Sequence, residues 1–234
     1  MNALEVSGLS VGYGPQPVVH GVGLRVRQGE VVALLGANGA GKTTTLMAVS
    51  GAIPSLAGDV LISGEAATRP LHERARRGLA YVTEERSVFK SLTVRDNLRV
   101  GDVEVESALC LFPELAKRLD VRAGLISGGE QQMLTVARAL AREPKVLLAD
   151  ELSLGLAPLV VTRLFLALRE AASSQGTAVL LVEQHVRKAL RYVDHVYVMR
   201  RGRVVLDLTA SEARERVADI EHAYLSTSEN ENVA

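Results

Sequence analysis

The sequence predicts an α/β fold with a mostly parallel central sheet. Short, uninterrupted apolar runs are typical of strands buried on both faces, and three of them occur, at residues 31–35, 146–149 and 178–182. Helical patterns separate these runs, as expected for parallel strands joined by helices. Residues 18–27 differ, because apolar residues there alternate with glycine and arginine, so we expect an antiparallel β part near the N-terminus.

The other elements follow along the chain. Strands are predicted at residues 4–13, 18–27, 60–62 and 79–82, and a hairpin at 196–199 and 204–206. Helices are predicted at residues 42–50, 130–141, 159–172 and 211–225. Residues 83–124 show helical spacing and no strand-like alternation. We therefore expect one domain, residues 1–225, with a helical subdomain inserted at about 84–140 and a polar tail at 226–234.

Composition narrows the classes of protein. The chain has 234 residues, of which 47% are hydrophobic, so it buries a substantial core and is not a disordered chain. It carries 27 Lys and Arg against 27 Asp and Glu, and this balance gives no support for a nucleic-acid partner. Cys110 lies among apolar residues of a helical pattern, so we expect a buried, inert thiol. No apolar run approaches the roughly 18 residues of a membrane span.

The strongest chemical motif lies at residues 36–43, which fit the pattern G-x-x-x-x-G-K-[ST]. The glycines let successive backbone N–H groups point at one anion, and the following helix adds its positive end. Lys42 reaches the β and γ phosphates, and the Thr43 hydroxyl is suited to Mg²⁺. A glycine-rich turn with a solvated lysine is the simpler alternative. The position between a buried strand and a helix favours a phosphate-binding loop, and thus a P-loop NTPase fold.

Two carboxylates, Asp150 and Glu151, end the apolar strand at 146–149. The carboxyl ends of parallel strands form the edge at which α/β proteins place their sites. Asp150 is suited to hold Mg²⁺, and Glu151 to polarise an attacking water as a general base. Solvated acids at a strand end would be the ordinary interpretation, but the phosphate loop in the same chain favours the catalytic one.

A third motif, Ser127-Gly128-Gly129-Glu130, has two interpretations. Ser127 and Glu130 fit a helix capping box, which is a structural role. Two glycines at a helix start also expose several N–H groups, which form an anion site. One chain would then hold two phosphate-binding helix ends, and two chains packed head to tail could each supply one to the same nucleotide.

Together these motifs resemble the ATP-binding subunits of ABC transporters over about residues 4–225. The resemblance implies that residues 126–130 are the family's signature sequence and that Glu84 takes the Q-loop position. It assigns His185 as the switch histidine at the γ-phosphate and Tyr13 as the adenine-stacking aromatic. Without the resemblance, His185 would be an ordinary structural histidine and Tyr13 an ordinary strand tyrosine.

The resemblance implies three sets of site residues. The expected contacts to ATP are Tyr13, Gly36, Asn38, Gly39, Ala40, Gly41, Lys42, Thr43, Thr44, Ser127, Gly128, Gly129 and Glu130. The expected ligands of Mg²⁺ are Thr43, Asp150 and Glu84. The expected catalytic residues are Lys42, Glu151 and His185.

Short strings at residues 127–133, 153–158 and 182–184, and Ala223-Tyr224-Leu225, are similar to ATPases of branched-chain amino acid uptake. The chain also departs from the wider family. Leu152 replaces a proline, and Ala157 replaces the D-loop aspartate. Glu84 stands where a glutamine is usual, and Thr83 replaces the proline that the subfamily often has before it.

The implied function is an ATPase that powers membrane transport, with uptake of branched-chain amino acids as the expected process. The expected partners are a second ABC ATPase subunit, identical or not, membrane permease subunits and, indirectly, a periplasmic or extracellular substrate-binding protein. We expect a peripheral protein at the cytoplasmic face of the cell membrane. The alternatives are a soluble ABC-type regulatory or DNA-maintenance ATPase, or an ABC ATPase for another small polar cargo. Regulatory and DNA-maintenance ATPases of this type usually carry a coiled-coil insertion, a second ATPase cassette or a basic surface. This chain has one cassette and no net charge, so transport is favoured.

Overall fold

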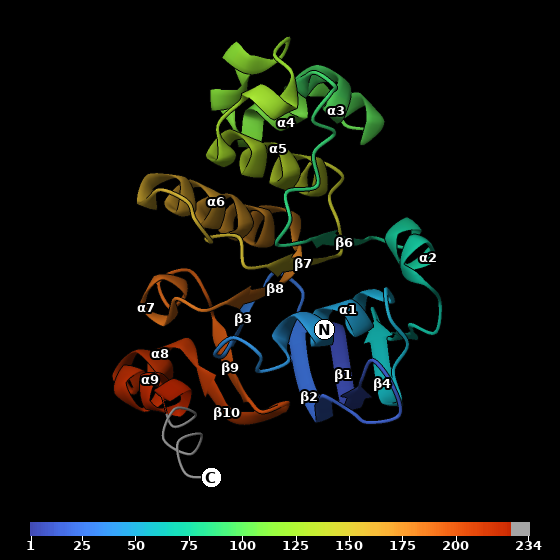
Figure 1. Cartoon of the computed structure of the whole chain (residues 1–234), viewed down its shortest axis with the longest axis vertical. Coiled ribbons are helices and arrows are strands. Elements are labelled where there is room, and N and C mark those ends of the chain that lie inside the picture. Colours follow the sequence, from blue (N-terminus) through green and yellow to red (C-terminus); the bar gives the residue numbers. More distant parts are fainter. Residues whose placement is uncertain (226–234) are drawn as a thin grey trace.

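A six-stranded sheet forms the centre of the computed structural model, which describes residues 1–225 (Figure 1). Its strand order is β10-β9-β3-β8-β7-β6. The strands are β3 (Val31–Leu35), β6 (Leu79–Val82), β7 (Val146–Asp150), β8 (Ala178–Glu183), β9 (His195–Arg200) and β10 (Arg203–Thr209). The first five are parallel, and β10 pairs antiparallel with β9. The predicted α/β class with a mostly parallel sheet is therefore confirmed.

A second, antiparallel sheet has the order β2-β1-β4-β5. Its strands are β1 (Asn2–Val11), β2 (Val19–Arg27), β4 (Ala57–Ile62) and β5 (Glu65–Ala66). Helix α1 (Lys42–Ser50) packs against both sheets and buries Leu46 and Val49 between them. This sandwich fixes the start of α1 at the carboxyl end of β3, where the predicted phosphate loop lies.

The central strands β3, β7 and β8 are apolar up to the acidic residues that end β7 and β8, because each face of the sheet has its own core. Val32, Leu34 and Leu148 face α1 and the antiparallel sheet. Ala33 and Leu35, which alternate with them along β3, face the helices on the other side. Side chains of a strand point to opposite faces in turn, so a strand covered on both sides is apolar along its middle.

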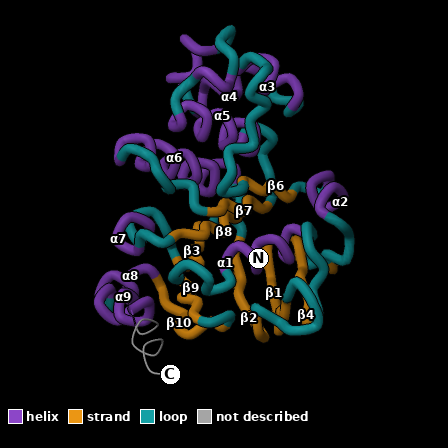
Figure 2. Tube along the Cα trace, viewed as in Figure 1, coloured by secondary structure: helices purple, strands orange, loops and turns teal. Residues whose placement is uncertain are grey.

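Helices cover that other side and form the upper part of the molecule (Figure 2). They are α3 (Val94–Val100), α4 (Val105–Leu111), α5 (Gly128–Leu140) and α6 (Pro158–Glu170), with 3-10 turns at Pro113–Arg118 and Ala123–Leu125. The other helices are α2 (Leu71–Arg76), α7 (Val186–Ala189), α8 (Ala210–Glu215) and α9 (Val217–Leu225). No element between residues 83 and 124 is a strand, as the sequence predicts.

Several predicted elements differ in detail. The predicted helix at 211–225 is two helices, α8 and α9, and α6 ends in a π-helical turn at Ala171–Gln175. The prediction for Cys110 was wrong: the residue is exposed, because α4 turns only Ala108 fully into the core. The predicted tail at 226–234 lies outside the described residues.

Candidate functional site

The loop between β3 and α1 needs glycine at two of its positions. A Cβ added to Gly36 would lie 2.4 Å from the carbonyl oxygen of Met199, so no side chain fits there. Gly41, the residue before α1, has φ +101°, a conformation that only glycine adopts without strain. The loop therefore passes close to β9 and curls so that α1 begins at Lys42.

This loop borders a cavity of about 410 Å³, a volume typical of small-molecule sites. From the loop and α1 the cavity is lined by Asn38, Gly39, Gly41, Lys42, Thr43 and Thr44. Glu84, Glu151 and Gln184 reach it from three other segments of the chain. The structure thus brings together most of the predicted phosphate and carboxylate residues.

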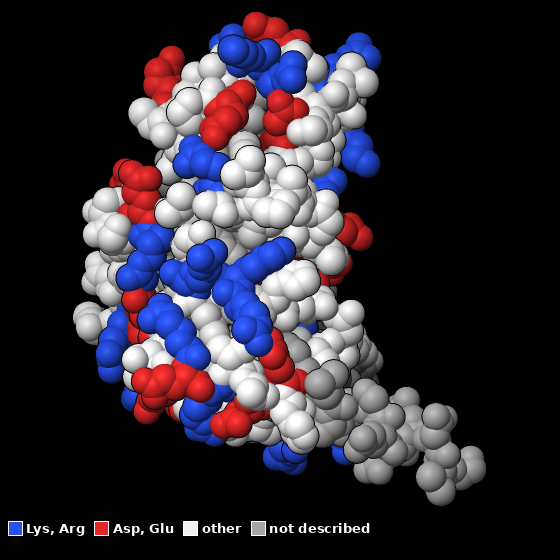
Figure 3. All heavy atoms as spheres, turned by 90° about the vertical axis from the view of Figure 1, so that its left-hand side faces the viewer, with Lys and Arg blue, Asp and Glu red and all other residues white. Residues whose placement is uncertain are grey.

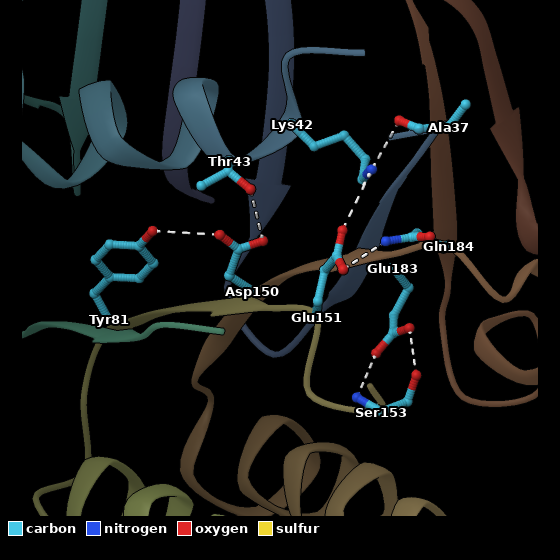
Figure 4. A network of polar contacts seen from close by, with 9 residues as sticks. All are labelled: Ala37, Lys42, Thr43, Tyr81, Asp150, Glu151, Ser153, Glu183 and Gln184. Carbon is cyan, nitrogen blue, oxygen red and sulfur yellow. Dashed lines mark hydrogen bonds and ion pairs between the residues drawn. The ribbon is translucent and has the colours of Figure 1, made fainter. Parts of the chain in front are cut away.

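Asp150 and Glu151 lie at the carboxyl end of β7, as predicted, and Asp150 meets the start of α1 (Figure 4). The Thr43 hydroxyl donates to Asp150 Oδ1 at 3.3 Å, and the Tyr81 hydroxyl approaches Oδ2 at 3.5 Å. The Thr43 hydroxyl and the Asp150 carboxylate therefore lie next to each other beside the cavity.

Asp150 has an unusually high pKa for an aspartate. Burial raises its pKa to about 6, and the negative charges of Glu151 and Glu84 add to the rise. The hydrogen bond from Thr43 and the charge of Lys42 act in the opposite direction. A nearby cation would stabilise the ionised form of this carboxyl.

The donor set fits Mg²⁺ rather than an all-protein metal centre. Within residues 1–225 no group of three or more His, Cys, Asp and Glu side chains is suited to hold a metal. Mg²⁺ usually takes one or two carboxylates together with phosphate oxygens and water. Thr43, Asp150 and the exposed Glu84 at the cavity supply such a partial set.

Lys42 is almost fully buried, at 3% exposure, and has two partners in the loop region. Its Nζ donates to the Ala37 carbonyl at 3.0 Å and lies 3.5 Å from Glu151 Oε1. Glu151 has φ +46°, in the left-handed region that residues with a Cβ rarely adopt. The predicted phosphate-binding lysine and the predicted base therefore form an ion pair.

The signature motif lies apart from this cavity, at the start of α5. Ser127 Oγ accepts from the Glu130 N–H at 3.2 Å, and Glu130 Oε2 accepts from the Ser127 N–H at 2.8 Å. This confirms the predicted capping box. Arg118 also binds the Glu130 carboxylate, at 2.7 Å. The motif does not line the cavity, so any contact between it and a nucleotide held at residues 36–43 requires another chain or a rearrangement.

Two predicted site residues lie at the margins. Tyr13 is 70% exposed, and its hydroxyl lies 3.3 Å from Thr44 Oγ1, so the ring flanks the start of α1. His185 is exposed at the N-terminal end of α7 and does not line the cavity. The roles of both residues in contact with ATP stay predictions.

The sequence analysis missed Gln184, which lines the cavity, and Tyr81, which contacts Asp150. Gln184 directly follows a buried strand, as Asp150 and Glu151 end one, so the same strand-end argument could have found it. Tyr81 is one residue before the end of β6, whose partner strand β7 carries Asp150. Knowing that β6 and β7 pair in parallel would have indicated that Tyr81 lies near Asp150.

Comparison with known proteins agrees with this geometry. The model of the family described as "ABC transporter" matches residues 19–153. The high-affinity branched-chain amino acid transport ATP-binding protein BraG of Pseudomonas aeruginosa is 41% identical over 218 residues, covering 89% of this chain and 93% of BraG. The lipopolysaccharide export system ATP-binding protein LptB of Escherichia coli is 35% identical, covering 91% and 92%.

Solved structures show the same fold. A structure described as the ATP-binding subunit of an ABC transporter superposes with a TM-score of 0.82 at 29% identity, covering 97% of this chain and all of the other. The phosphate loop, the two carboxylates at the end of β7 and the family match agree with one another. The chain belongs to the ABC transporter family and is an ATP-binding, ATP-hydrolysing subunit.

Proposed function

We propose that this ATPase powers the uptake of branched-chain amino acids. The observation that carries the proposal is the 41% identity to BraG over nearly the full length of both chains. A second candidate is export or uptake of another cargo, because LptB, named for lipopolysaccharide export, is 35% identical over a similar length. The higher identity to BraG favours the amino acid cargo.

At the site, we assign the binding of the ATP phosphates to the N–H groups of residues 36–43 and to the Lys42 ammonium. A curled loop and a helix start provide aligned N–H donors, and the lysine adds a charge-assisted contact. Tyr13, whose hydroxyl lies beside Thr44 at the start of α1, would stack on the adenine. Thr43, Asp150 and Glu84 would hold Mg²⁺, which supplies charge neutralisation of the phosphates.

Glu151 acts as the general base in this proposal. Its carboxylate takes a proton from a water, the water oxygen bonds to the γ phosphorus, and the bond to the bridging oxygen of ADP breaks. The family resemblance assigns His185 to the γ-phosphate, and this assignment remains a proposal alongside the one for Glu151.

The signature motif, residues 127–130, would cap the γ-phosphate of a nucleotide held by a second subunit. Its separation from the cavity in one chain supports this arrangement. The unit that works is then a dimer, identical or mixed, of ABC ATPase domains that each span residues 1–225 and carry a helical subdomain at about 84–140.

We further propose a peripheral location on the cytoplasmic face of the cell membrane, through permease subunits that receive cargo from a binding protein outside. No helix within residues 1–225 has the length and apolar character of a membrane span. A nucleic-acid partner is not part of the proposal. Lys and Arg gather on the face shown in Figure 3, but acidic side chains lie among them, and ion pairs such as Arg187–Glu221 and Arg216–Asp219 partly neutralise them.

The test is to purify the chain with its membrane partners, identify these by mass spectrometry and reconstitute the complex in liposomes with its binding protein. We expect ATP hydrolysis to rise with leucine, isoleucine or valine and not with glutamate, and labelled leucine to accumulate with ATP. Stimulation by a different cargo, with no response to the three amino acids, would contradict the assignment.

A further inference from the structure

A second cavity, of about 430 Å³, lies beside α2 (Figure 1). Its walls come from the hairpin of β4 and β5, from α2 and the residues that flank it, and from the loop between α5 and β7. Its volume is typical of small-molecule sites. It shares no lining residue with the nucleotide cavity at the phosphate loop. We call it the α2 cavity, and a ligand held there would leave the nucleotide site free.

Positive charge dominates the lining of the α2 cavity. Its charged side chains are the cations Arg69, Arg74, Arg76, Arg77 and Lys145 and the carboxylates Glu65 and Glu143. Among these, within residues 1–225, one ion pair joins the two sets: Arg77 Nη1 lies 3.1 Å from Glu65 Oε2, and both side chains are more than half exposed. Exposed pairs contribute little to stability, so an incoming anion can displace this one. The chain itself therefore leaves an excess of positive charge around the cavity.

Arg74 is oriented by the C-terminal end of α1. Its Nη1 donates to the carbonyl oxygens of Ala48 at 3.1 Å and Val49 at 2.7 Å, and its Nε donates to the Arg69 carbonyl at 2.5 Å. Gly51 permits this approach, because a Cβ there would lie 2.6 Å from Arg74 Nε. Nη2 makes no hydrogen bond to any part of the chain that the structure describes. The guanidinium is thus fixed in place and keeps N–H donors for a ligand.

Lys145 is placed by a second glycine. Its side chain lies over Gly78, where an added Cβ would come within 3.1 Å of Lys145 Cγ, and Gly78 has φ +100°. Strands β6 and β7 pair in parallel, with Leu79 opposite Val146. Arg77 and Lys145 stand just before these two strands, so strand pairing brings both cations to the same edge of the sheet. This is the amino-terminal edge, opposite to the one that carries the nucleotide site.

We propose that the α2 cavity binds a small aliphatic molecule with two or more phosphate or carboxylate groups. Guanidinium groups match the oxygens of either group in bidentate geometry, and the excess of cations favours a ligand with several negative charges. Ile62, Ala66 and Ala67 also line the cavity and suit a short carbon skeleton. In the described chain this lining contains no aromatic ring, so nothing there would stack on a nucleotide base.

Isothermal titration calorimetry of the whole chain tests the proposal, with fructose bisphosphate and citrate as the probes. Saturating Mg-ADP is present throughout, so that the phosphate loop is already occupied. Arg77→Gln and Lys145→Gln each remove one charge from the cavity and keep a polar side chain. Lys117→Gln removes one charge from an exposed position outside the cavity and is the matched control.

We expect at least one of the two probes to bind with a stoichiometry of one per chain. Arg77→Gln and Lys145→Gln should each raise its Kd about 10-fold, because each removes charge-assisted hydrogen bonds. Lys117→Gln should leave the Kd within about 2-fold of wild type. Tighter binding of fructose bisphosphate than of citrate would identify phosphate as the preferred group, and the reverse order would identify carboxylate.

Failure of both probes to bind would overturn the proposal. Equal weakening by Lys117→Gln and the two cavity variants would also overturn it, because that pattern indicates general attraction to surface charge. The titration is repeated without ADP on wild type and on Lys42→Ala. Binding that occurs only without ADP and is lost in Lys42→Ala would place the probe in the phosphate loop, and the proposal would fail. Thermal unfolding of each variant without probe shows whether a loss of affinity reflects the fold.

Discussion

The N-termini of α1 and α5 both present backbone N–H groups, but the pKa values of the carboxyl groups beside them shift in opposite directions. Asp150, near α1, is bonded by hydroxyls of Thr43 and Tyr81, and burial raises its pKa to about 6. For Glu130, in the first turn of α5, burial acts to raise the pKa, but hydrogen bonds from Arg118 and Ser127 outweigh it and lower the pKa.

The opposite pKa shifts at the two helix ends indicate which of them requires a bound ligand. The region at α1 contains charge that the chain itself does not balance well, as expected of a site completed by a cation and phosphates. The motif at α5 is already satisfied by its own capping box and by Arg118. Its position away from the cavity suits contact with another chain.

The largest effect is expected at the base of the α1 site. Glu151→Gln should lower kcat by about 100-fold or more, within the range that general bases contribute. The variant keeps the shape and should still bind nucleotide. Steady-state phosphate release measures kcat. Hydrolysis at the wild-type rate, in the presence of the proper partner subunit, would show that Glu151 is not the base.

The next effect concerns the phosphate contact. Lys42→Ala should weaken Mg-ATP binding by roughly 10- to 100-fold, because hydrogen bonds to charged groups contribute about 1.5–3 kcal/mol. Equilibrium titration with a fluorescent ATP analogue measures the affinity, and circular dichroism checks the fold. If the variant kept wild-type affinity for Mg-ATP, the start of α1 would not be the phosphate-binding site.

The opposite pKa shifts of Asp150 and Glu130 predict opposite changes in stability when the carboxylate is replaced by an amide. Asp150 has a higher pKa in the folded chain, about 6, than its ordinary value of 3.8. Its favourable contribution is therefore full below pH 3.8 and is lost as the pH rises through about 6. At pH 7 and without nucleotide, Asp150→Asn should raise the free energy of unfolding by about 1–3 kcal/mol.

Glu130→Gln should act in the other direction. Its folded pKa is lowered from 4.5, so its contribution is present above that pH and is lost as the pH falls. The variant should be less stable than wild type at pH 7, and the gap should narrow in acid. Urea unfolding at pH 4 and pH 7 measures both variants. If the free energy of unfolding changed in the same direction for Asp150→Asn and Glu130→Gln at pH 7, the proposed contrast between the two sites would be wrong.

The smallest effect on stability is expected at the α5 cap. Ser127→Ala should cost about 1 kcal/mol of stability, the usual value of an N-cap, and should leave nucleotide affinity of the single chain unchanged. Thr209→Ala is a matched control, because Thr209 and Glu212 form the same capping box on α8. Both variants should lose similar stability, and only Ser127→Ala should lose ATPase activity. Equal activity of the two would assign Ser127 to structure alone.

Much of the α1 site could be predicted because its parts are local in the sequence. Residues 36–43 combine glycines and a lysine whose chemistry does not depend on distant contacts, and Asp150 and Glu151 end a strand that is apolar throughout. The strand runs themselves are predictable, since burial on both faces makes each strand apolar along its middle.

Other features depend on contacts that the sequence does not display. Cys110 has apolar neighbours, yet the short helix α4 buries only Ala108 fully. The packing of α4 against α3 and α5 decides which of its faces points into the core. Similarly, the family resemblance assigned His185 to the γ-phosphate, whereas the structure brings its neighbour Gln184 to the cavity. Which of two neighbouring residues reaches the cavity depends on the path of the chain after β8, and residue type does not reveal that path.

The central claim is that a complete site needs the α1 end of one chain and the α5 end of another. Analytical ultracentrifugation of Glu151→Gln with ATP, with ADP and without nucleotide tests it most directly, alone and mixed with a second ATPase subunit if one copurifies. The account predicts a dimer with ATP, because the γ-phosphate is the group that spans both chains, and monomers in the other two conditions. Sedimentation that ATP leaves unchanged in both preparations would contradict it.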